Sequence, residues 1–366
     1  MAFSPDGRTL YSGSYDGSAI AWDVSGARRL GRPFPLAPSS APSSFQSDVS
    51  PDGSRFATSP GPNEVELWNS STRAVVRELR GPVGDSHDIR FSPDGRLVGV
   101  AGSKHAVVWV VRTGKIMRAF PVGPAMTGGS NTVAFSPDGR VLAVQGAESE
   151  IRLYDLRTGE PVIKLPADDG TPQDIDFSPD GTLLASATLA GEAELWDAKT
   201  GRSLARVSNG SNHQAFDSAV SFSPDGKLLA IGDTSGKVVL WDVTKRRPVG
   251  RPLAGQDVSI HTVDFDPSGQ MLITMSSDGN LRLWDVATQK LIGAPIPVST
   301  GDGSAEFFPD GTHVFGDFGP TGVVWNVDPV AWEAQACRVA HRNLTREEWN
   351  DFLGQRRYRP VCRVTH

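Results

Sequence analysis

Short apolar segments recur along the chain, separated by turns rich in glycine, proline, serine and aspartate. Residues 260–265 alternate apolar and polar side chains, which is typical of a β-strand with one covered face. Residues 271–275 form an apolar run, which we expect in a strand covered on both faces. Residues 280–285 and 291–296 complete a set of four strands, and Asp-Gly at 278–279 supplies a hairpin turn.

This set of strands occurs eight times in phase. The first turn of each unit reads Phe-Ser-Pro-Asp-Gly or a close variant, and its glycines are Gly7, Gly53, Gly95, Gly139, Gly181, Gly226, Gly269 and Gly311, spaced 42 to 46 residues apart. About 15 residues after each glycine an aromatic residue ends the third strand: Trp22, Trp68, Trp109, Tyr154, Trp196, Trp241, Trp284 and Trp325. A period of about 40–45 residues with a closing Trp-Asp predicts one four-stranded propeller blade per unit.

The repeat predicts an all-β propeller over residues 1–326, with units near 1–34, 45–79, 86–120, 130–165, 172–207, 217–253, 260–296 and 303–326. We expect eight blades, because residues 18–23 and 28–34 are local hairpin partners whose separation would expose an apolar hairpin. The alternative is a seven-bladed ring in which residues 28–34 pair with 323–326, leaving 1–23 over. The Pro- and Ser-rich stretch 35–44 is either a surface loop or a seam between two propellers.

The units resemble WD-repeat β-propellers over about nine tenths of the chain. The resemblance implies that the repeated tryptophans pack between blades and that polar side chains form hydrogen bonds around them. The Gly-His dipeptide expected before the first strand is absent, because residues 81–82 read Gly-Pro and residues 255–256 read Gly-Gln. We therefore expect a weaker polar network and a stability that rests more on packing. A Trp→Ala change at Trp196 or Trp241 is then expected to cost roughly 3–5 kcal/mol.

Two repeat positions hold candidate site residues. The first lies four residues before the motif phenylalanine, near a mouth of the channel, and holds His87, Asn131, Gln173, Ser218 and His261, with Phe45 and Gly303 in two further units. The second lies just before that phenylalanine, on the channel side of the strand, and holds Asp48, Arg90, Asp176, Ser221, Asp264 and Glu306, with Ala134 as the apolar exception. Such residues suit a binding rim and a site for a cation or a basic side chain, or else they contact only channel water.

No catalytic motif accompanies these residues. The chain has no nucleophile elbow, phosphate loop, zinc-protease helix motif or EF-hand spacing. The two histidines of the rim are four blades apart, which is unsuitable for one metal ion. We therefore predict no catalytic residue, no metal and no cofactor. The alternative is a small-molecule-binding or hydrolytic propeller that uses the acidic channel, where two carboxylates about 5–10 Å apart would be needed for glycosidase chemistry.

Net charge and hydropathy indicate which classes of partner to expect. The net charge is −6, which argues against a nucleic-acid ligand, although residues 338–366 carry seven arginines against three acidic residues. No apolar run approaches the ~18 residues of a membrane helix, and no secretory signal is visible. We therefore expect a monomeric, cytoplasmic propeller that binds a protein or peptide, or an upstream domain of the same polypeptide, and neither nucleic acid nor membrane.

Residues 327–366 depart from the strand pattern and predict a short helical cap. Asp328 is a suitable N-cap before residues 331–340, and Thr345 to Glu348 form a capping box. The only two cysteines, Cys337 and Cys362, either form a disulfide or remain thiols.

The order of tryptophan, cysteine, arginine and asparagine residues in this tail is similar to the end of actinobacterial signalling proteins. Those proteins carry WD repeats behind a STAND-type NTPase, a kinase or a transcriptional-regulator module. The resemblance implies a scaffold or sensor role. The first unit also begins within its innermost strand, so we expect the chain to be the carboxyl-terminal part of a longer protein.

Overall fold

Each repeat unit folds into short antiparallel strands joined by tight turns. The computed structural model describes residues 2–3, 9–13, 19–23, 31–35, 47–122, 131–145, 150–166, 172–188, 192–208, 218–255, 258–293, 295–297, 304–318, 321–328 and 346. Within these residues every element longer than one residue is a β-strand. The all-β class predicted from the apolar pattern is therefore confirmed for this part of the chain.

One unit becomes one blade of four consecutive strands, from the innermost β9 (Ser86–Phe91) through β10 (Leu97–Gly102) and β11 (His105–Val110) to the outermost β12 (Lys115–Pro121). Phe91 pairs with Val98, and Val98 pairs with Trp109 across the next strand. The motif phenylalanine and the closing tryptophan thus stand on either side of one residue of the second strand. This register places the repeated aromatic residues in the interface between blades.

The first turn of the blade explains the Ser-Pro-Asp-Gly motif. Ser92 Oγ donates a hydrogen bond to Asp94 Oδ1 at 2.7 Å, and the Arg96 backbone N–H donates to the same oxygen at 3.0 Å. The Leu97 N–H donates to Ser92 Oγ at 2.9 Å, which starts the second strand. Gly95 adopts a φ of 66°, a left-handed conformation that other residue types rarely adopt. The motif is therefore turn chemistry.

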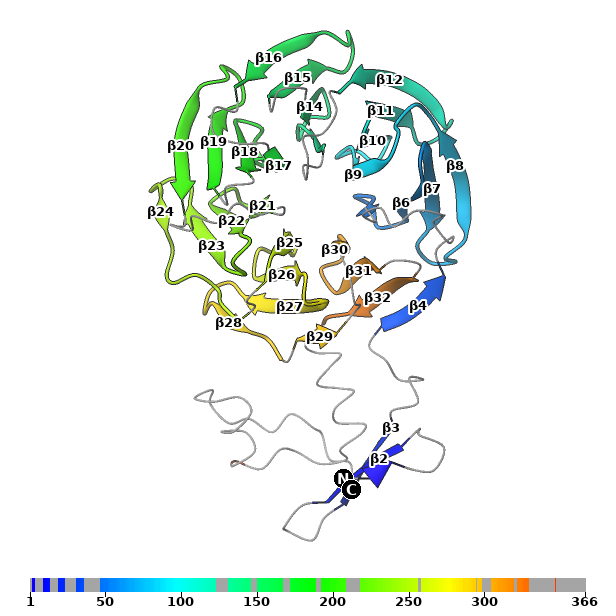
Figure 1. The fold of residues 1–366 in the computed structure, drawn as a ribbon, viewed down its shortest axis with the longest axis vertical. Helices are drawn as coiled ribbons and strands as arrows, with labels where there is room; N and C mark the ends of the chain where they lie inside the picture. Colours follow the sequence, from blue (N-terminus) through cyan, green and yellow to red (C-terminus); the bar gives the residue numbers. More distant parts are fainter. Residues whose placement is uncertain are drawn as a thin grey trace. The chain divides into compact units, whose positions relative to one another are not determined.

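Five further sheets repeat this order from the innermost to the outermost strand. They are β5 (Ser47–Val49), β6 (Arg55–Gly61), β7 (Glu64–Asn69) and β8 (Val75–Arg80); β13 (Val133–Phe135), β14 (Val141–Gln145), β15 (Ile151–Asp155) and β16 (Pro161–Leu165); β17 (Pro172–Phe177), β18 (Leu183–Thr188), β19 (Glu192–Asp197) and β20 (Ser203–Ser208); β21 (Ala219–Phe222), β22 (Leu228–Gly232), β23 (Val238–Asp242) and β24 (Arg247–Pro248); and β25 (Ile260–Phe265), β26 (Met271–Ser276), β27 (Asn280–Asp285) and β28 (Lys290–Leu291), with β29 (Ile296–Pro297) also paired to β27. Figure 1 shows these sheets around a common axis, with the first strand of each sheet innermost.

The seventh blade corrects the prediction of eight. Its inner strands are β30 (Ser304–Phe307), β31 (His313–Phe318) and β32 (Thr321–Asn326), and its outer strand is β4 (Gly31–Pro35). The ring therefore has seven blades, closed by strands from both ends of the ring sequence. The local hairpin expected between residues 18–23 and 28–34 does not form. The physical reason is that in the described residues no strand after β32 covers its outer edge, so β4 fills the edge that would otherwise stay open.

A separate three-stranded sheet contains β1 (Ala2–Phe3), β2 (Thr9–Gly13) and β3 (Ala19–Asp23). It is the strand set of the first repeat unit without its outer strand. The helices expected at 331–340 and after Thr345, and both cysteines, lie outside the described residues, of which Arg346 is the only one beyond Asp328.

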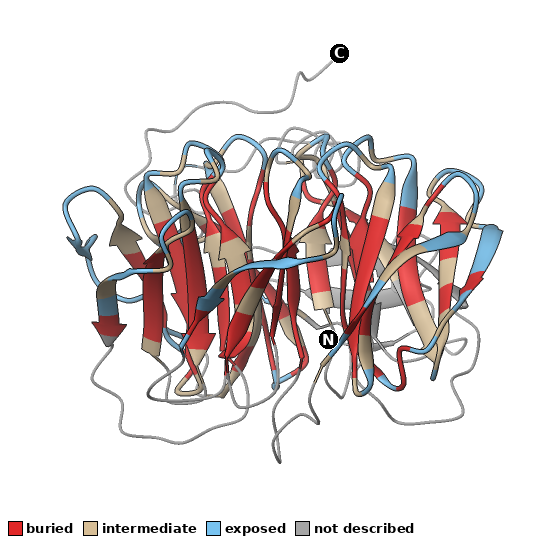
Figure 2. Cartoon of the chain, turned by 90° about the horizontal axis from the view of Figure 1, so that it is seen from above, coloured by how far each residue is buried: buried red, intermediate tan, exposed pale blue. Residues whose placement is uncertain are grey.

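The apolar core lies between neighbouring blades. Buried residues fill the inner strands, whereas exposed residues concentrate on turns and outer strands (Figure 2). Trp109 is fully buried in a cluster that spans two blades, and the rings of Phe56 and Phe315 stack with centroids 4.6 Å apart across another junction. Each blade is therefore stabilised by packing against the blades on both of its faces.

The polar network around the tryptophans is present in some blades and missing in others. The indole N–H groups of three tryptophans donate to a hydroxyl on the second strand: Trp68 to Thr58, Trp196 to Ser186 and Trp284 to Thr274, at 2.9–3.0 Å. The indole nitrogens of Trp109 and Trp241 are buried without a hydrogen-bond partner. The equivalent positions on their second strands are Val100 and Ile231, which have no hydroxyl.

Candidate functional site

The innermost strands surround a polar channel. Each innermost strand pairs with one neighbour only, so its other edge presents backbone N–H and C=O groups to the channel. A cavity of about 420 Å³ occupies this region. Six carboxylates and one guanidinium line it, namely Asp48, Asp88, Asp174, Asp176, Asp264, Glu306 and Arg90.

Four of these carboxylates stand just before the motif residue and connect successive blades. Asp176 Oδ2 accepts a hydrogen bond from the Phe222 N–H at 2.8 Å, and Asp264 Oδ2 accepts one from the Phe307 N–H at 2.9 Å. Glu306 Oε2 likewise accepts from Val49 N–H at 2.9 Å, and Asp48 accepts from Phe91 N–H. Each acceptor lies on one innermost strand and each donor on the next. We call these contacts inter-blade clasps; they satisfy N–H groups at the open strand edges.

Two further clasps involve residues that sequence reasoning missed. Asp88 Oδ2 accepts from the Val133 N–H at 2.9 Å and from Thr132 Oγ1 at 2.8 Å. Asp174 Oδ2 accepts from the Val220 N–H at 2.9 Å. Both aspartates lie two residues earlier in their strands than the position predicted to face the channel. Strand alternation gives that earlier position the same side of the strand, so the period of two was the signal that could have found them.

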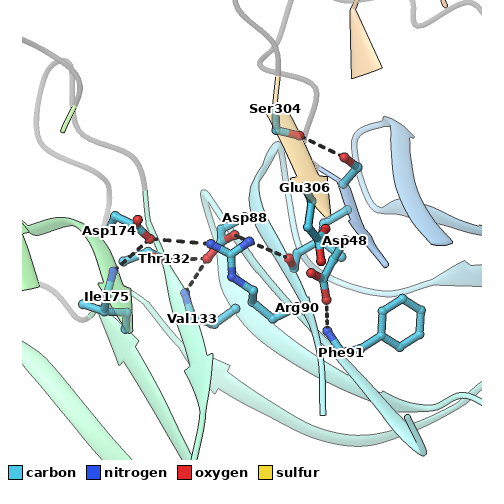
Figure 3. A network of polar contacts seen from close by, with 12 residues as sticks. Asp48, Asp88, Arg90, Phe91, Thr132, Val133, Asp174, Ile175, Ser304 and Glu306 are labelled. Carbon is cyan, nitrogen blue, oxygen red and sulfur yellow. Dashed lines mark hydrogen bonds and ion pairs between the residues drawn. The ribbon is translucent and has the colours of Figure 1, made fainter. Parts of the chain in front are cut away.

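Arg90 takes a different role from the carboxylates at its repeat position. Its guanidinium lies 3.4 Å from Asp88 on its own strand and 3.6 Å from Asp174 on β17, measured between nitrogen and oxygen (Figure 3). Asp174 belongs to the second blade along, so Arg90 reaches past the intervening blade. That blade carries Ala134 at the equivalent position, and its small side chain leaves the space that the arginine spans.

Burial changes the protonation of the channel carboxylates. Removal from water raises the pKa of Asp48 and Asp176 to about 6 and that of Asp174 and Asp264 to about 7, although Arg90 opposes the shift. The pKa of Glu306 lies well above its usual range because of burial and the adjacent Asp48 carboxylate. These four aspartates therefore gain negative charge as the pH rises through about 6–7.

The residues predicted at the channel mouth are placed in two ways. His87, Gln173, Ser218 and His261 line the cavity. Asn131 is buried and is not among the lining residues; its backbone N–H donates to His87 Nδ1 at 3.1 Å. Burial lowers the pKa of His87, which favours the neutral ring that accepts this bond. Phe45 and Gly303 lie outside the described residues.

The other three mouth residues also make hydrogen bonds. Ser218 Oγ donates to the Thr188 carbonyl on the preceding blade at 2.9 Å, and Gln173 Nε2 donates to the Pro172 carbonyl at 3.1 Å. His261 Nε2 and Ser277 Oγ share a hydrogen bond of 2.7 Å. Ser218 is therefore held by the preceding blade, whereas Gln173 and His261 are held within their own blades.

The chemistry available in the channel depends on which side chains the structure brings together. In the described part of the chain no group of three or more histidine, cysteine, aspartate or glutamate residues is placed to hold a metal ion. The described residues also include no helix long and apolar enough to cross a membrane. The channel offers an acidic cup of fixed shape in which each clasp carboxylate already has a backbone donor. Such a cup suits the recognition of a cationic group.

Comparisons with known proteins agree with this fold. The sequence model for the N-terminal domain of nucleolar protein 10-like proteins, a β-propeller, matches residues 130–310, and that for the WD domain, G-beta repeat, matches residues 1–23. WD repeat-containing protein 1 is 32% identical over 78 residues in Rattus norvegicus, covering 20% of this chain and 13% of that protein. The guanine nucleotide-binding protein subunit beta-1 of Caenorhabditis briggsae is 30% identical over 124 residues, covering 33% and 35%.

These matches span well under two thirds of the relatives' own lengths. They support the repeat and the fold, but they identify no binding or catalytic site. Together with the seven blades, six of four strands and one of five, they support a WD-repeat β-propeller, as the Trp-Asp repeat predicted.

Proposed function

We propose that this protein is a non-catalytic interaction scaffold or sensor module that binds a basic segment of a protein partner at the acidic channel mouth. WD-repeat relatives and the propeller fold fit a protein-interaction scaffold in general. The single observation that carries the proposal is the cavity of about 420 Å³ lined by six carboxylates and one guanidinium. A rigid acidic cup on a ring of this kind favours lysine or arginine side chains.

The geometry favours binding over catalysis. General acid–base catalysis needs a carboxyl group that is free to exchange a proton with a substrate at about 2.6–3.2 Å. The pKa values near 7 at Asp174 and Asp264 would suit that chemistry, and they are the observation that favours a hydrolytic or small-molecule-binding propeller. Both carboxylates, however, accept a backbone N–H from the next blade, so moving them to serve a substrate would open a blade junction.

The wider context of the scaffold is also part of the proposal. The resemblance of the tail to actinobacterial signalling proteins supports a regulatory role in a larger bacterial cytoplasmic protein. In that arrangement the propeller receives a partner, and a domain elsewhere in the polypeptide acts. The proposal predicts that the 366-residue chain alone has no turnover of its own.

A binding experiment with a defined probe tests the channel. An arginine-rich decapeptide labelled with a fluorophore is titrated with the protein, and anisotropy reports Kd. Asp176→Asn and Asp264→Asn remove two charges while an amide oxygen can still accept the clasp N–H. We expect the double variant to bind at least about tenfold more weakly, and binding of the natural sequence to weaken as the pH falls from 8 to 5.5.

Two controls separate this result from general acidity. Asp138→Asn and Asp225→Asn remove two exposed turn carboxylates, which lie outside the cavity lining, and should leave Kd within about twofold. A decapeptide of the same length with glutamate in place of arginine should not bind. Equal loss in the turn double variant, or an unchanged Kd in the channel double variant, would refute the proposed site.

A further inference from the structure

The sheet β1–β3 has the cross-strand register of a propeller blade. Phe3 pairs with Leu10, and Leu10 pairs with Trp22. In the ring the same three repeat positions pair in the same way, for example in the sheet that holds Phe177, Leu184 and Trp196. The WD-domain sequence model matches residues 1–23 independently. Strands β1–β3 therefore correspond to the three inner strands of a blade.

The fourth strand of this blade is used elsewhere. In the chain the outer strand follows the third strand, and the segment that follows β3 is β4. Strand β4 instead completes the sheet β30–β31–β32, which closes the ring at seven blades. In the described sheets β3 consequently has β2 as its only partner, and the closed ring has no place for an eighth blade.

A propeller blade needs neighbours on both faces. In the ring Trp196 packs in a cluster with Leu153 of the preceding blade, whereas Leu195 packs in a cluster with Val220 of the following blade. The sequence of β3 is apolar from Ala19 to Trp22, which matches this two-faced interface. A repeat unit cannot bury such faces alone, because each unit relies on stacking against the next.

We infer that residues 2–23 form the closing blade of a second WD-type propeller, whose blades cover both faces of β1–β3 and whose own outer strand pairs along β3. The first ring shows how such closure works, since β30–β32 supply three inner strands and β4 arrives from the other end of the ring sequence. In the second ring β1–β3 take the place that β30–β32 take in the first.

A second copy of this chain does not meet the requirement. Its ring is already closed by its own β4, and among the described strands its β1–β3 sheet has no outer strand either. The occupant must therefore bring both flanking blades and a spare outer strand. This inference concerns the sheet β1–β3 alone, so it stands or fails independently of the proposed role of the channel.

A thermal unfolding experiment on the 366-residue chain tests whether β1–β3 contribute to the stability of the ring. Trp196→Ala should lower the Tm of the ring by roughly 10 °C, because it empties a buried site between blades. The matched variant Trp22→Ala, at the same repeat position, should leave that Tm within about 1 °C. A Tm loss for Trp22→Ala as large as for Trp196→Ala would overturn the inference, since it would make β1–β3 part of this ring.

Hydrogen exchange then tests the occupant. In the isolated chain the amides of β2 and β3 should exchange at least about 100-fold faster than those of β18 and β19, because the inference assigns the flanking blades of this sheet to the second propeller. In the protein isolated from its source cells, with any chain bound or joined to it, the same amides should be protected to the level of the ring. Fast exchange in both preparations overturns the inference. Protection in the isolated chain that rises with its concentration indicates a second copy and also overturns it.

Discussion

Asp176 in the channel wall and Asp180 in the first turn of the same blade lie four residues apart. The pKa values of their carboxyl groups shift in opposite directions. Burial raises the pKa of Asp176 in the channel wall to about 6. Hydrogen bonds from Ser178 and from the backbone and side chain of Thr182 lower the pKa of Asp180 in the turn. Folding therefore opposes the charge of Asp176 and favours the charge of Asp180.

The difference shows where the charge of an acidic residue stabilises the folded state and where it destabilises it. A turn aspartate is partly exposed and accepts several local hydrogen bonds, so its charge adds to stability. A channel aspartate accepts a hydrogen bond from the next blade through one oxygen. Removal from water and neighbouring carboxylates, however, disfavour its charged form. Carboxyl groups kept in such an environment are typical of functional sites. The comparison is tested below by changes that act on one region and spare the other.

The largest effect is expected from loss of the channel cation. Arg90→Met leaves the Asp88 and Asp174 carboxylates without the guanidinium between them. The free energy of unfolding at pH 8 should fall by about 2–4 kcal/mol, the lower part of the range applying because the Arg90 side chain is 36% exposed. Urea unfolding at pH 8 and pH 5 measures it, and the loss should shrink at pH 5, where Asp174, whose pKa burial raises to about 7, takes up a proton.

The matched control lies in the first turn of the same blade. Arg96 forms an ion pair of 3.6 Å with Asp94, and its side chain is 83% exposed. Arg96→Met should change the free energy of unfolding by less than about 1 kcal/mol at either pH. Equal losses for the two arginines would contradict the distinction between channel and turn.

The free energy of unfolding should vary with pH in two limbs, an upper limb set by the channel carboxylates and a lower limb set by the turn aspartates. The folded-state pKa values of the channel carboxylates exceed those of the unfolded chain, so their contribution is complete below about pH 4 and is lost as the pH rises through about 6–7. The turn aspartates have lowered values, about 2 for Asp225, so their contribution is present above about pH 4 and is lost on acidification.

The Tm measured by circular dichroism should therefore be highest near pH 5 and fall by several degrees toward pH 8 and toward pH 3. Asp174→Asn with Asp264→Asn should flatten the upper limb and leave the lower limb unchanged. A Tm that rises steadily from pH 5 to pH 8 would be inconsistent with buried channel acids.

Loss of one turn carboxylate should have a smaller effect. Asp180 accepts hydrogen bonds from Ser178 Oγ at 2.6 Å and from the Thr182 N–H at 3.0 Å. Asp180→Ala should cost about 1–2 kcal/mol at pH 7 by urea unfolding. The double variant with Ser178→Ala should cost less than the sum of the single changes, because both remove the same contact.

The smallest effect has the opposite sign. Asp176→Asn keeps an oxygen that can accept the Phe222 N–H and removes a charge that folding opposes. At pH 8 the variant should be as stable as the natural sequence or more stable by up to about 1 kcal/mol. The same unfolding measurement on Asp180→Asn should show a loss. A clear loss in both variants would indicate that the Asp176 charge contributes to stability.

The strands and the propeller class could be predicted because they depend on local patterns. Turn motifs, alternation and the closing tryptophan all lie within one unit of about 43 residues. The number of blades depends instead on a choice between two partners for β4, one local and one at the far end of the ring. Strand propensity and alternation are the same for both choices, so they do not decide between them. Closeness along the chain favoured the local hairpin, whereas the structure contains the distant pairing.

The candidate site divides in the same way. Alternation directed Asp48, Asp176, Asp264 and Glu306 toward the channel, and the structure has them in the cavity lining. Their second role, as acceptors for N–H groups on the next blade, depends on how innermost strands are staggered across a junction. Nothing in a single unit reports that stagger. The span of Arg90 past Ala134 likewise depends on three blades at once.

Closure by β4 sets the order of events during synthesis. Strand β4 is made early, whereas its partner β32 begins about 290 residues later. At about 5–20 residues per second, β4 waits roughly 15–60 seconds for the strand it pairs with. During that interval the blades can stack one on another as an open arc, but the ring cannot close. Until β32 is made, the edge that β4 will cover in the ring does not exist, so β4 is an unpaired strand during synthesis.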